Sequence, residues 1–255
     1  MSIATEHIGT VIQGPTIFYK EIVAHYKDVP NVVWSTWEDE PAEHIAYIRA
    51  AGMPLVLQDK KGLEPGHHNT NLQCLSTYGG IEFLSGNPAI THILKIRADF
   101  LPNPFPVFLE QCAKSLEHKE MAYMGYVWYY PQKMQQRYYL VDFLNAGTLA
   151  AMKRFWRPDF NANNGFPNPE KWLENRYYHS ENYLEKNYKK LVKQGAFIVF
   201  KGFAIKSLKL HIDFGRRIFK DGIYRDQPTL KERWQHVQKL TEIVFKRIIT
   251  LNKGA

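Results

Sequence analysis

The chain has few cysteines and no long hydrophobic run, and these two deficits already exclude several classes of protein. Its 255 residues include only Cys74 and Cys112, so neither a disulfide framework nor a cysteine-rich metal knuckle can form. No segment approaches the roughly 18 consecutive apolar residues that a membrane-spanning helix needs. The first residues also lack the basic flank and apolar stretch of a secretory signal. We therefore expect a cytoplasmic protein.

Acidic residues are also in deficit. Lysine and arginine number 33 and aspartate and glutamate 25, which gives a formal net charge of +8. This excess favours an anionic partner, which could be nucleic acid, an acidic lipid surface or a phosphorylated small molecule. With 45% hydrophobic and 23% charged residues, the chain can bury a sizeable core. Its length fits one composite domain, with an α/β half at 1–120 and a second half at 121–255.

The first hundred residues alternate between short β-branched runs and helical patterns. The expected strands cover 10–13, 31–36, 54–58 and 91–96, and the expected helices 17–26, 41–51 and 71–84. Such alternation predicts right-handed crossovers and a mostly parallel, Rossmann-like sheet flanked by helices. The second half lacks this alternation of strands and helices, and its pattern predicts an α+β arrangement. It contains aromatic strands at 121–130 and 137–142, a turn at 145–147 that leads into a short helix ending near Trp156, a long helix at 169–194, one or two strands at 197–210 and an amphipathic helix at 228–252.

Ligands of parallel α/β sheets bind at the carboxyl ends of the strands. The fourth strand ends in Lys95, Arg97 and Asp99. A carboxylate there can hold Mg²⁺ or Mn²⁺, which would neutralise a diphosphate together with the two cations. The same residues also fit an ordinary Arg–Asp pair at a solvated strand end.

The sequence contains no glycine-rich phosphate loop of either common type, which disfavours kinases, P-loop proteins and classical dehydrogenases. Asn69 and Asn71 open the third helix, where free backbone N–H groups favour an anion and where an Asn is also an ordinary cap. A general base must be ionised and within reach of the acceptor hydroxyl. Glu170 at a helix start is the first candidate and Asp142 the second, although a first-turn Glu also simply complements the helix dipole.

Four segments resemble, in order and spacing, the motifs of the WavE-type lipopolysaccharide synthesis proteins. They read VIQGP at 11–15, VWSTWE at 33–38, NTNLQCLST at 69–77 and ILKIRAD at 93–99. The segment VDFLNAG at 141–147 is similar to an acceptor-side turn of several GT-A families. The resemblance implies a GT-A-like fold.

The resemblance also implies a metal-dependent glycosyltransferase. We expect an inverting reaction, which uses one of the two general bases, while a retaining reaction, which needs no base in that place, stays open. The enzyme would move a sugar from a nucleoside-diphosphate sugar to a glycan or lipid-linked acceptor hydroxyl in surface polysaccharide synthesis. Asp99 would bind Mg²⁺ or Mn²⁺, although Arg97 stands where the first Asp of the Asp-x-Asp motif belongs. The implied donor-binding residues are Gln13, Gly14, Pro15, Thr36, Glu38, Asn69, Asn71, Gln73, Lys95 and Arg97.

Two further hypotheses stay open. A sugar nucleotidyltransferase could use the same sheet to activate a sugar from a nucleoside triphosphate. A basic nucleic-acid-binding module would also explain the charge, but the acidic loop 38–40 beside the expected site argues against nucleic acid. The basic helix expected at 228–252 could instead rest on an anionic membrane, which would bring the protein to the inner face of that membrane.

Overall fold

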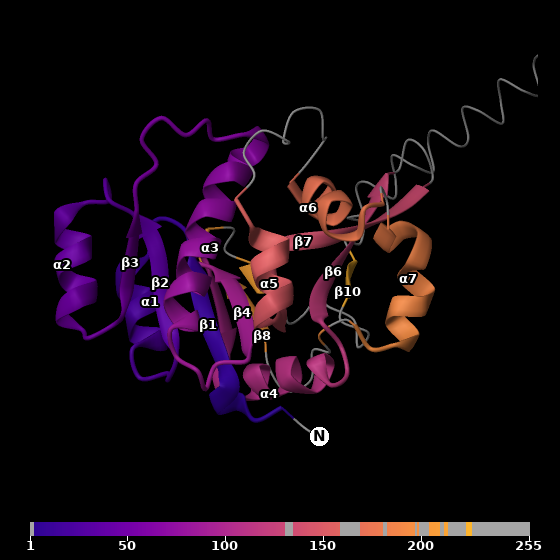
Figure 1. Ribbon diagram of the computed structural model, residues 1–255, viewed down its shortest axis with the longest axis horizontal. Helices are drawn as coiled ribbons and strands as arrows, with labels where there is room; N and C mark the ends of the chain where they lie inside the picture. Colours follow the sequence, from indigo (N-terminus) through magenta and orange to yellow (C-terminus); the bar gives the residue numbers. More distant parts are fainter. Residues whose placement is uncertain are drawn as a thin grey trace, which may run out of the picture.

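The computed structural model describes residues 3–130, 135–158, 169–180, 183–196, 198, 204–209, 212–213 and 223–225 (Figure 1). A seven-stranded sheet runs through the middle of the molecule, in the order β10-β6-β7-β4-β1-β2-β3. Its strands are β1 (Ile8–Gln13), β2 (Val32–Trp37), β3 (Leu55–Gln58), β4 (His92–Arg97), β6 (Met121–Tyr130), β7 (Gln135–Thr148) and β10 (Ile223–Arg225).

The sheet is mostly parallel. Strands β1, β2, β3 and β4 pair in parallel, and so do β6 and β10. Only β7 runs antiparallel to its two neighbours, β4 and β6. This architecture confirms the expected GT-A-like, mostly parallel sheet, and strands from both halves of the chain take part in it. The boundary at residue 120 remains a prediction.

Helices cover both faces of the sheet (Figure 1). They are α1 (Tyr19–Tyr26), α2 (Ala42–Ala50), α3 (Thr70–Ser85), α4 (Phe105–Leu116), α5 (Leu149–Trp156), α6 (Pro169–Tyr178) and α7 (Tyr183–Lys193), with short 3₁₀ helices at Thr5–His7 and His67–Asn69. A second sheet of three strands consists of β5 (Phe100–Asn103), β8 (Ala204–Ser207) and β9 (Ile212–Asp213). None of the described helices is long and apolar enough to cross a bilayer.

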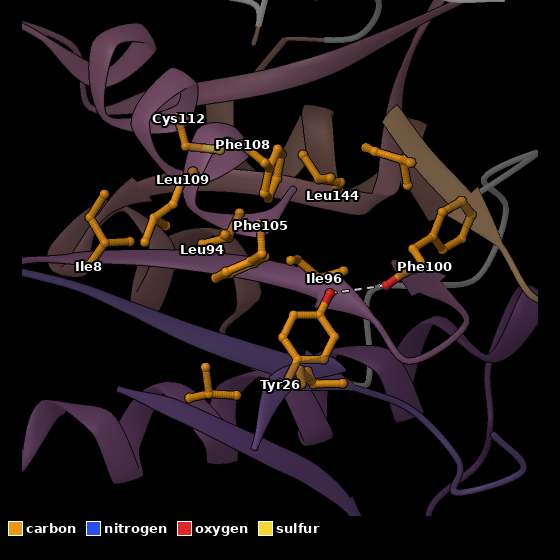
Figure 2. Packing of buried hydrophobic residues seen from close by; sticks show 14 of the residues in the cluster. Ile8, Tyr26, Leu94, Ile96, Phe100, Phe105, Phe108, Leu109, Cys112 and Leu144 are labelled. Atoms are coloured by element: carbon orange, nitrogen blue, oxygen red, sulfur yellow. Dashed lines mark hydrogen bonds between the residues drawn. The ribbon is translucent and has the colours of Figure 1, made fainter. Parts of the chain in front are cut away.

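Two hydrophobic cores lie on opposite faces of the main sheet. The first joins the sheet to α1, α2 and α4, and the second joins it to α3, α5, α6 and α7. Figure 2 shows part of the first core, where the Tyr26 hydroxyl donates a hydrogen bond of 3.2 Å to the carbonyl oxygen of Phe100. Side chains alternate along the strands, as Ile12 of β1 belongs to the first core and Val11 to the second.

Helix α3 lies very close to the sheet because Gly80 faces it. A Cβ atom on Gly80 would lie 2.5 Å from Cγ1 of Val11 and 3.2 Å from Cβ of Ser35. Any larger side chain would therefore push the helix away from β1 and β2. The close approach places the N-terminal half of α3 against the carboxyl ends of these strands.

The second half departs from the expectations in three places. The helix expected at 169–194 is two helices, because His179 adopts a left-handed backbone conformation (φ 51°) between α6 and α7. Strand β7 continues to Thr148 instead of turning at 145–147, because β4 pairs with that segment. Helix α4, which has Pro106 in its first turn, was not foreseen. The helix expected at 228–252 lies outside the described residues.

Candidate functional site

The candidate site is the carboxyl edge of the sheet on the α3 side. Strand register places Gln13 of β1 between Ser35 of β2 and Arg97 of β4. Two residues before Arg97 on the same strand, Lys95 of β4 lies beside Asn145 of β7. Alternation along each strand turns these side chains toward the face that α3 and α5 cover. Polar groups from four strands therefore meet where apolar residues would be expected.

Several polar atoms at this place are buried and have no hydrogen-bond partner among the residues that the structure describes. They include Gln13 Oε1, Ser35 Oγ and Thr77 Oγ1, and the Nδ2 atom of Asn145. These residues are between 0 and 4% exposed. An unpartnered buried polar group costs about 1–3 kcal/mol, so folded proteins rarely keep several of them together without a reason. We call Gln13, Ser35, Thr77 and Asn145 the polar floor, and we interpret them as the lower surface of a binding site at this edge of the sheet.

The loop after β1 is held in one conformation. Gly14 has φ 127°, which only glycine adopts without strain, and its carbonyl oxygen accepts a 3.0 Å hydrogen bond from Trp34 Nε1. Pro15 is exposed. The adjoining Thr16 donates from its backbone N–H and its hydroxyl to Glu40 Oε2, at 3.0 and 2.5 Å.

Glu40 connects this loop to the loop after β2. Its other oxygen, Oε1, accepts a 3.2 Å hydrogen bond from the Thr36 hydroxyl. His44 Nδ1 lies 2.9 Å from the Thr16 hydroxyl and completes the network. The carboxylate thus occupies the anion position that the Thr16 N–H would otherwise offer to a phosphate. Glu38, by contrast, is exposed.

The start of α3 faces the same edge. Asn69 is exposed and left-handed (φ 61°), and its side chain does not cap the helix. Asn71 is buried and its Nδ2 donates a 3.0 Å hydrogen bond to the Glu64 carbonyl oxygen. Gln73 Nε2 donates to the His68 carbonyl oxygen at 3.4 Å, while its Oε1 has no partner. These contacts fix the preceding loop and leave the helix N-terminus directed at the edge, where its dipole favours negative charge.

Lys95 is fully buried, unlike the strand-end cation that the sequence suggested. Its ammonium group donates a hydrogen bond to the backbone carbonyl oxygen of Asp142 and lies 4.7 Å from the centre of the Trp156 ring. Burial lowers the pKa of Lys95 from 10.5 to about 8, and the Asp142 carboxylate opposes that shift. Lys95 therefore contributes charge from below the edge without reaching its surface.

Arg97 and Asp99 form a closed ion pair. Arg97 Nε and Nη2 lie 2.6 and 2.9 Å from the two carboxylate oxygens of Asp99, whose side chain is only 9% exposed. The guanidinium also lies 4.9 Å from the centre of the Phe100 ring, which stacks on Phe143. This is the bidentate geometry of a strong structural pair.

A divalent ion does not fit this arrangement. Both oxygens of Asp99 already bind Arg97, which stands where a second acidic ligand would be needed. Within the described part of the chain, no group of three or more His, Cys, Asp or Glu side chains could hold a metal ion. The residues do not suit the expected Mg²⁺ or Mn²⁺ at Asp99, so we derive no step through a metal.

The two expected general bases lie in different settings. Asp142 is in the middle of β7 instead of at a strand end, and is 6% exposed. Glu170 is the second residue of α6, and its side chain is not described. The structure does not bring the two together at the edge.

Four residues that shape the site are not among the site residues that the sequence predicted. They are Ser35, Glu40, Thr77 and Asn145. Ser35 and Thr36 interrupt the apolar run of β2, and Ser35 was a usable signal, because a hydroxyl in a buried strand needs a partner. The roles of the other three depend on contacts between elements far apart in sequence.

Comparisons with known proteins give a likeness of fold. No protein-family model matches the chain, and no curated protein matches it either. A 4-diphosphocytidyl-2C-methyl-D-erythritol synthase from Anaerococcus prevotii shares 10% identity, with a TM-score of 0.42, over 67% of this chain and 84% of its own.

Two other solved structures are similar to the same degree. One is described as a glucose-1-phosphate thymidylyltransferase from Bacillus anthracis, with 10% identity and a TM-score of 0.42, covering 68% of this chain and 83% of its own. The other is a cytidylyltransferase from Leptospira borgpetersenii, with 13% identity and a TM-score of 0.37, covering 75% and 74%.

The prediction of glycosyl transfer to an acceptor hydroxyl is wrong. It depended on Asp99 holding a cation in an open pocket, and Asp99 is instead closed in an ion pair with Arg97.

Proposed function

We propose that this protein is a sugar nucleotidyltransferase that binds a nucleoside triphosphate at the carboxyl edge of β1, β2 and β4. The observation that carries the proposal is the polar floor, in which the buried oxygen atoms of Gln13, Ser35 and Thr77 have no partner within the described residues. Polar groups kept unpaired at the ligand edge of a parallel sheet are typical of a binding site, where stability is given up for recognition.

The charges at the edge favour the same kind of substrate. Arg97 is neutralised by Asp99, and Lys95 lies opposite the carboxylate of Asp142, so the floor carries little net charge. A neutral, polar nucleoside suits such a floor. The phosphates would extend toward the N-terminus of α3, where the helix dipole favours an anion.

The proposed reaction transfers a nucleotidyl group without a covalent enzyme intermediate. A phosphate oxygen of a sugar 1-phosphate attacks the α-phosphorus of the triphosphate and forms a new P–O bond. The bond from the α-phosphorus to the oxygen bridging the β-phosphate breaks, and pyrophosphate leaves with that electron pair. The protein's part is to align the two phosphorylated substrates.

The direct test is pyrophosphate release. We expect release when the protein is incubated with the correct triphosphate and sugar 1-phosphate from a panel of each, and none when either is omitted. A second incubation contains a nucleotide sugar and no triphosphate. Release of free nucleoside diphosphate there, with no pyrophosphate in the first, would refute the proposal.

A variant of Gln13 tests the floor itself. Gln13→Leu removes the unpartnered amide, so we expect the melting temperature to rise by about 2–4 °C. The stabilisation by bound triphosphate should fall at the same time, because the nucleoside loses a polar contact. Gln58→Leu, at the end of the neighbouring strand β3, is the matched control and should keep the triphosphate effect. Equal losses in both variants would contradict the assignment.

The use of the product is a separate part of the proposal. The resemblance to WavE-type proteins suggests that the activated sugar enters surface polysaccharide synthesis. The panel of sugar 1-phosphates tests this, since we expect turnover of sugars that occur in such polysaccharides.

A further inference from the structure

Helix α7 carries a row of four exposed lysines. They are Lys186, Lys189, Lys190 and Lys193, and we call them the α7 lysine stripe. Their spacing of three, four and seven residues places them on one face of the helix, over about two turns. The stripe is therefore a compact line of positive charge.

The stripe is electrostatically unpaired within the part of the chain that the structure describes. Within the described residues, no acidic side chain forms an ion pair with any of the four lysines. Two partly exposed lysines elsewhere on the surface do form ion pairs, Lys60 with Asp39 and Lys153 with Glu82, each at 2.9 Å. Lysines in a last helical turn complement the helix dipole, which would explain two of the four but not Lys186 or Lys189.

The four lysine side chains of the stripe are exposed to solvent because the opposite face of α7 packs on the protein. On another face of α7, Leu191 is buried in the second core. At the start of the helix, on the side of the stripe, the Tyr183 ring stacks on Tyr178 with ring centres 3.8 Å apart. The helix lies at the end of the molecule opposite α2 (Figure 1). Among the described side chains of α7, Leu191 and Val192 pack in the second core, and the four lysines are exposed to a partner.

We propose that the α7 lysine stripe docks the protein on an anionic phospholipid surface. Four cations in line on a rigid helix complement a flat layer of phosphate groups, and each lysine near such a surface strengthens binding. Because the apolar side is buried, the helix rests on the headgroups without inserting. Single-stranded nucleic acid is the less suitable partner, because its bases would need an aromatic ring to stack on and the Tyr183 ring already stacks on Tyr178.

The expected effect is an electrostatic one. Removing one lysine should weaken binding about fivefold, so the double variant Lys189→Gln/Lys193→Gln should bind roughly 25-fold more weakly. Binding should also fall as the salt concentration rises, since screening shortens the reach of the charges. This inference does not depend on the proposed nucleotidyl transfer.

The test is cosedimentation of the full chain with vesicles. We expect binding at 0.1 M salt to vesicles of phosphatidylglycerol and phosphatidylcholine, and none to vesicles of phosphatidylcholine alone. The matched control is Lys60→Gln/Lys153→Gln, which removes the same charge from paired sites. The control should bind like the unaltered protein.

Three results would overturn the proposal. They are an absence of binding to the anionic vesicles, an equal loss in the two double variants, and a stripe-dependent affinity for single-stranded oligonucleotides that exceeds the affinity for vesicles. Melting curves of both variants show that each is folded before the comparison is made.

Discussion

The buried ammonium of Lys95 makes a quantitative prediction about how stability depends on pH. Its pKa is about 8 in the folded protein, whereas the ordinary value for lysine is 10.5. At 1.36 kcal/mol for each pKa unit, this difference corresponds to about 3 kcal/mol. The cause is desolvation, since Lys95 is completely buried between β4 and the ring of Trp156.

The direction of the effect follows from proton linkage. Below pH 8 the lysine is charged in both states, and the folded protein bears the whole cost of burying the charge. Between pH 8 and pH 10.5 the folded protein loses the proton while the unfolded chain keeps it, so stability rises with pH. The contribution of Lys95 to the free energy of unfolding should therefore increase by about 3 kcal/mol across this window.

Lys95→Met isolates this contribution. Methionine fills similar space without a charge, so we expect the stability difference between the unaltered protein and the variant to change by about 3 kcal/mol, in favour of lysine, from pH 7.5 to 10.5. The buried tyrosines Tyr26 and Tyr123, whose pKa values burial raises, affect both proteins equally.

The measurement is urea unfolding at a series of pH values. Lys27→Met is the control, because that side chain is about half exposed. Its stability difference from the unaltered protein should change little with pH over this range. A difference for Lys95→Met that stays constant across the window would refute the argument, because it would mean that the ammonium is solvated.

Two further substitutions test the packing of α3 and the loop network. Gly80→Ala should destabilise the protein by about 1–3 kcal/mol, because the new methyl group would lie 2.5 Å from Val11 Cγ1, and thermal unfolding measures this cost. Glu40→Gln should cost about 1–3 kcal/mol in urea unfolding, because Thr16 and Thr36 lose charge-assisted hydrogen bonds.

Each of these two substitutions has a nearby control. Gly86→Ala places its methyl group 3.3 Å from the carbonyl oxygen of Phe83, outside the helix-to-sheet contact, and should cost less than Gly80→Ala. Glu43→Gln changes an exposed carboxylate on α2 and should leave stability nearly unchanged. Equal effects within either pair would show that the named contacts are not the cause.

The α/β architecture of the first half could be predicted because its signals are local. Short β-branched runs, the helix between 71 and 84 and the breaks at Gly14 and Pro41 each depend on neighbours in sequence. The edge at which we propose that a ligand binds could be chosen for the same reason, since the carboxyl ends of parallel strands share one side of a sheet. The resemblance added the expected GT-A-like arrangement, which the sheet confirms.

The chemistry at that edge could not be predicted, because it depends on elements distant in sequence. The sequence suggested that Lys95 is a cation at a strand end. In the structure its ammonium group is buried, because it contacts the Asp142 carbonyl oxygen of β7 and the Trp156 ring of α5. The residues Arg97 and Asp99 are only two apart, yet sequence spacing fits either a metal ligand or an ion pair. The buried aromatic setting of Phe100 and Phe143 favours the pair.

The sequence by itself determined the parallel sheet, its helical cover and the edge at which a ligand would bind, because propensity and periodicity act over a few residues. Tertiary structure alone decided which polar groups at that edge are neutralised and which remain unpaired. Gln13 and Ser35 come from different strands and Thr77 from the helix above them. Burial and hydrogen bonding belong to such a three-dimensional neighbourhood, which folding creates from residues far apart along the chain.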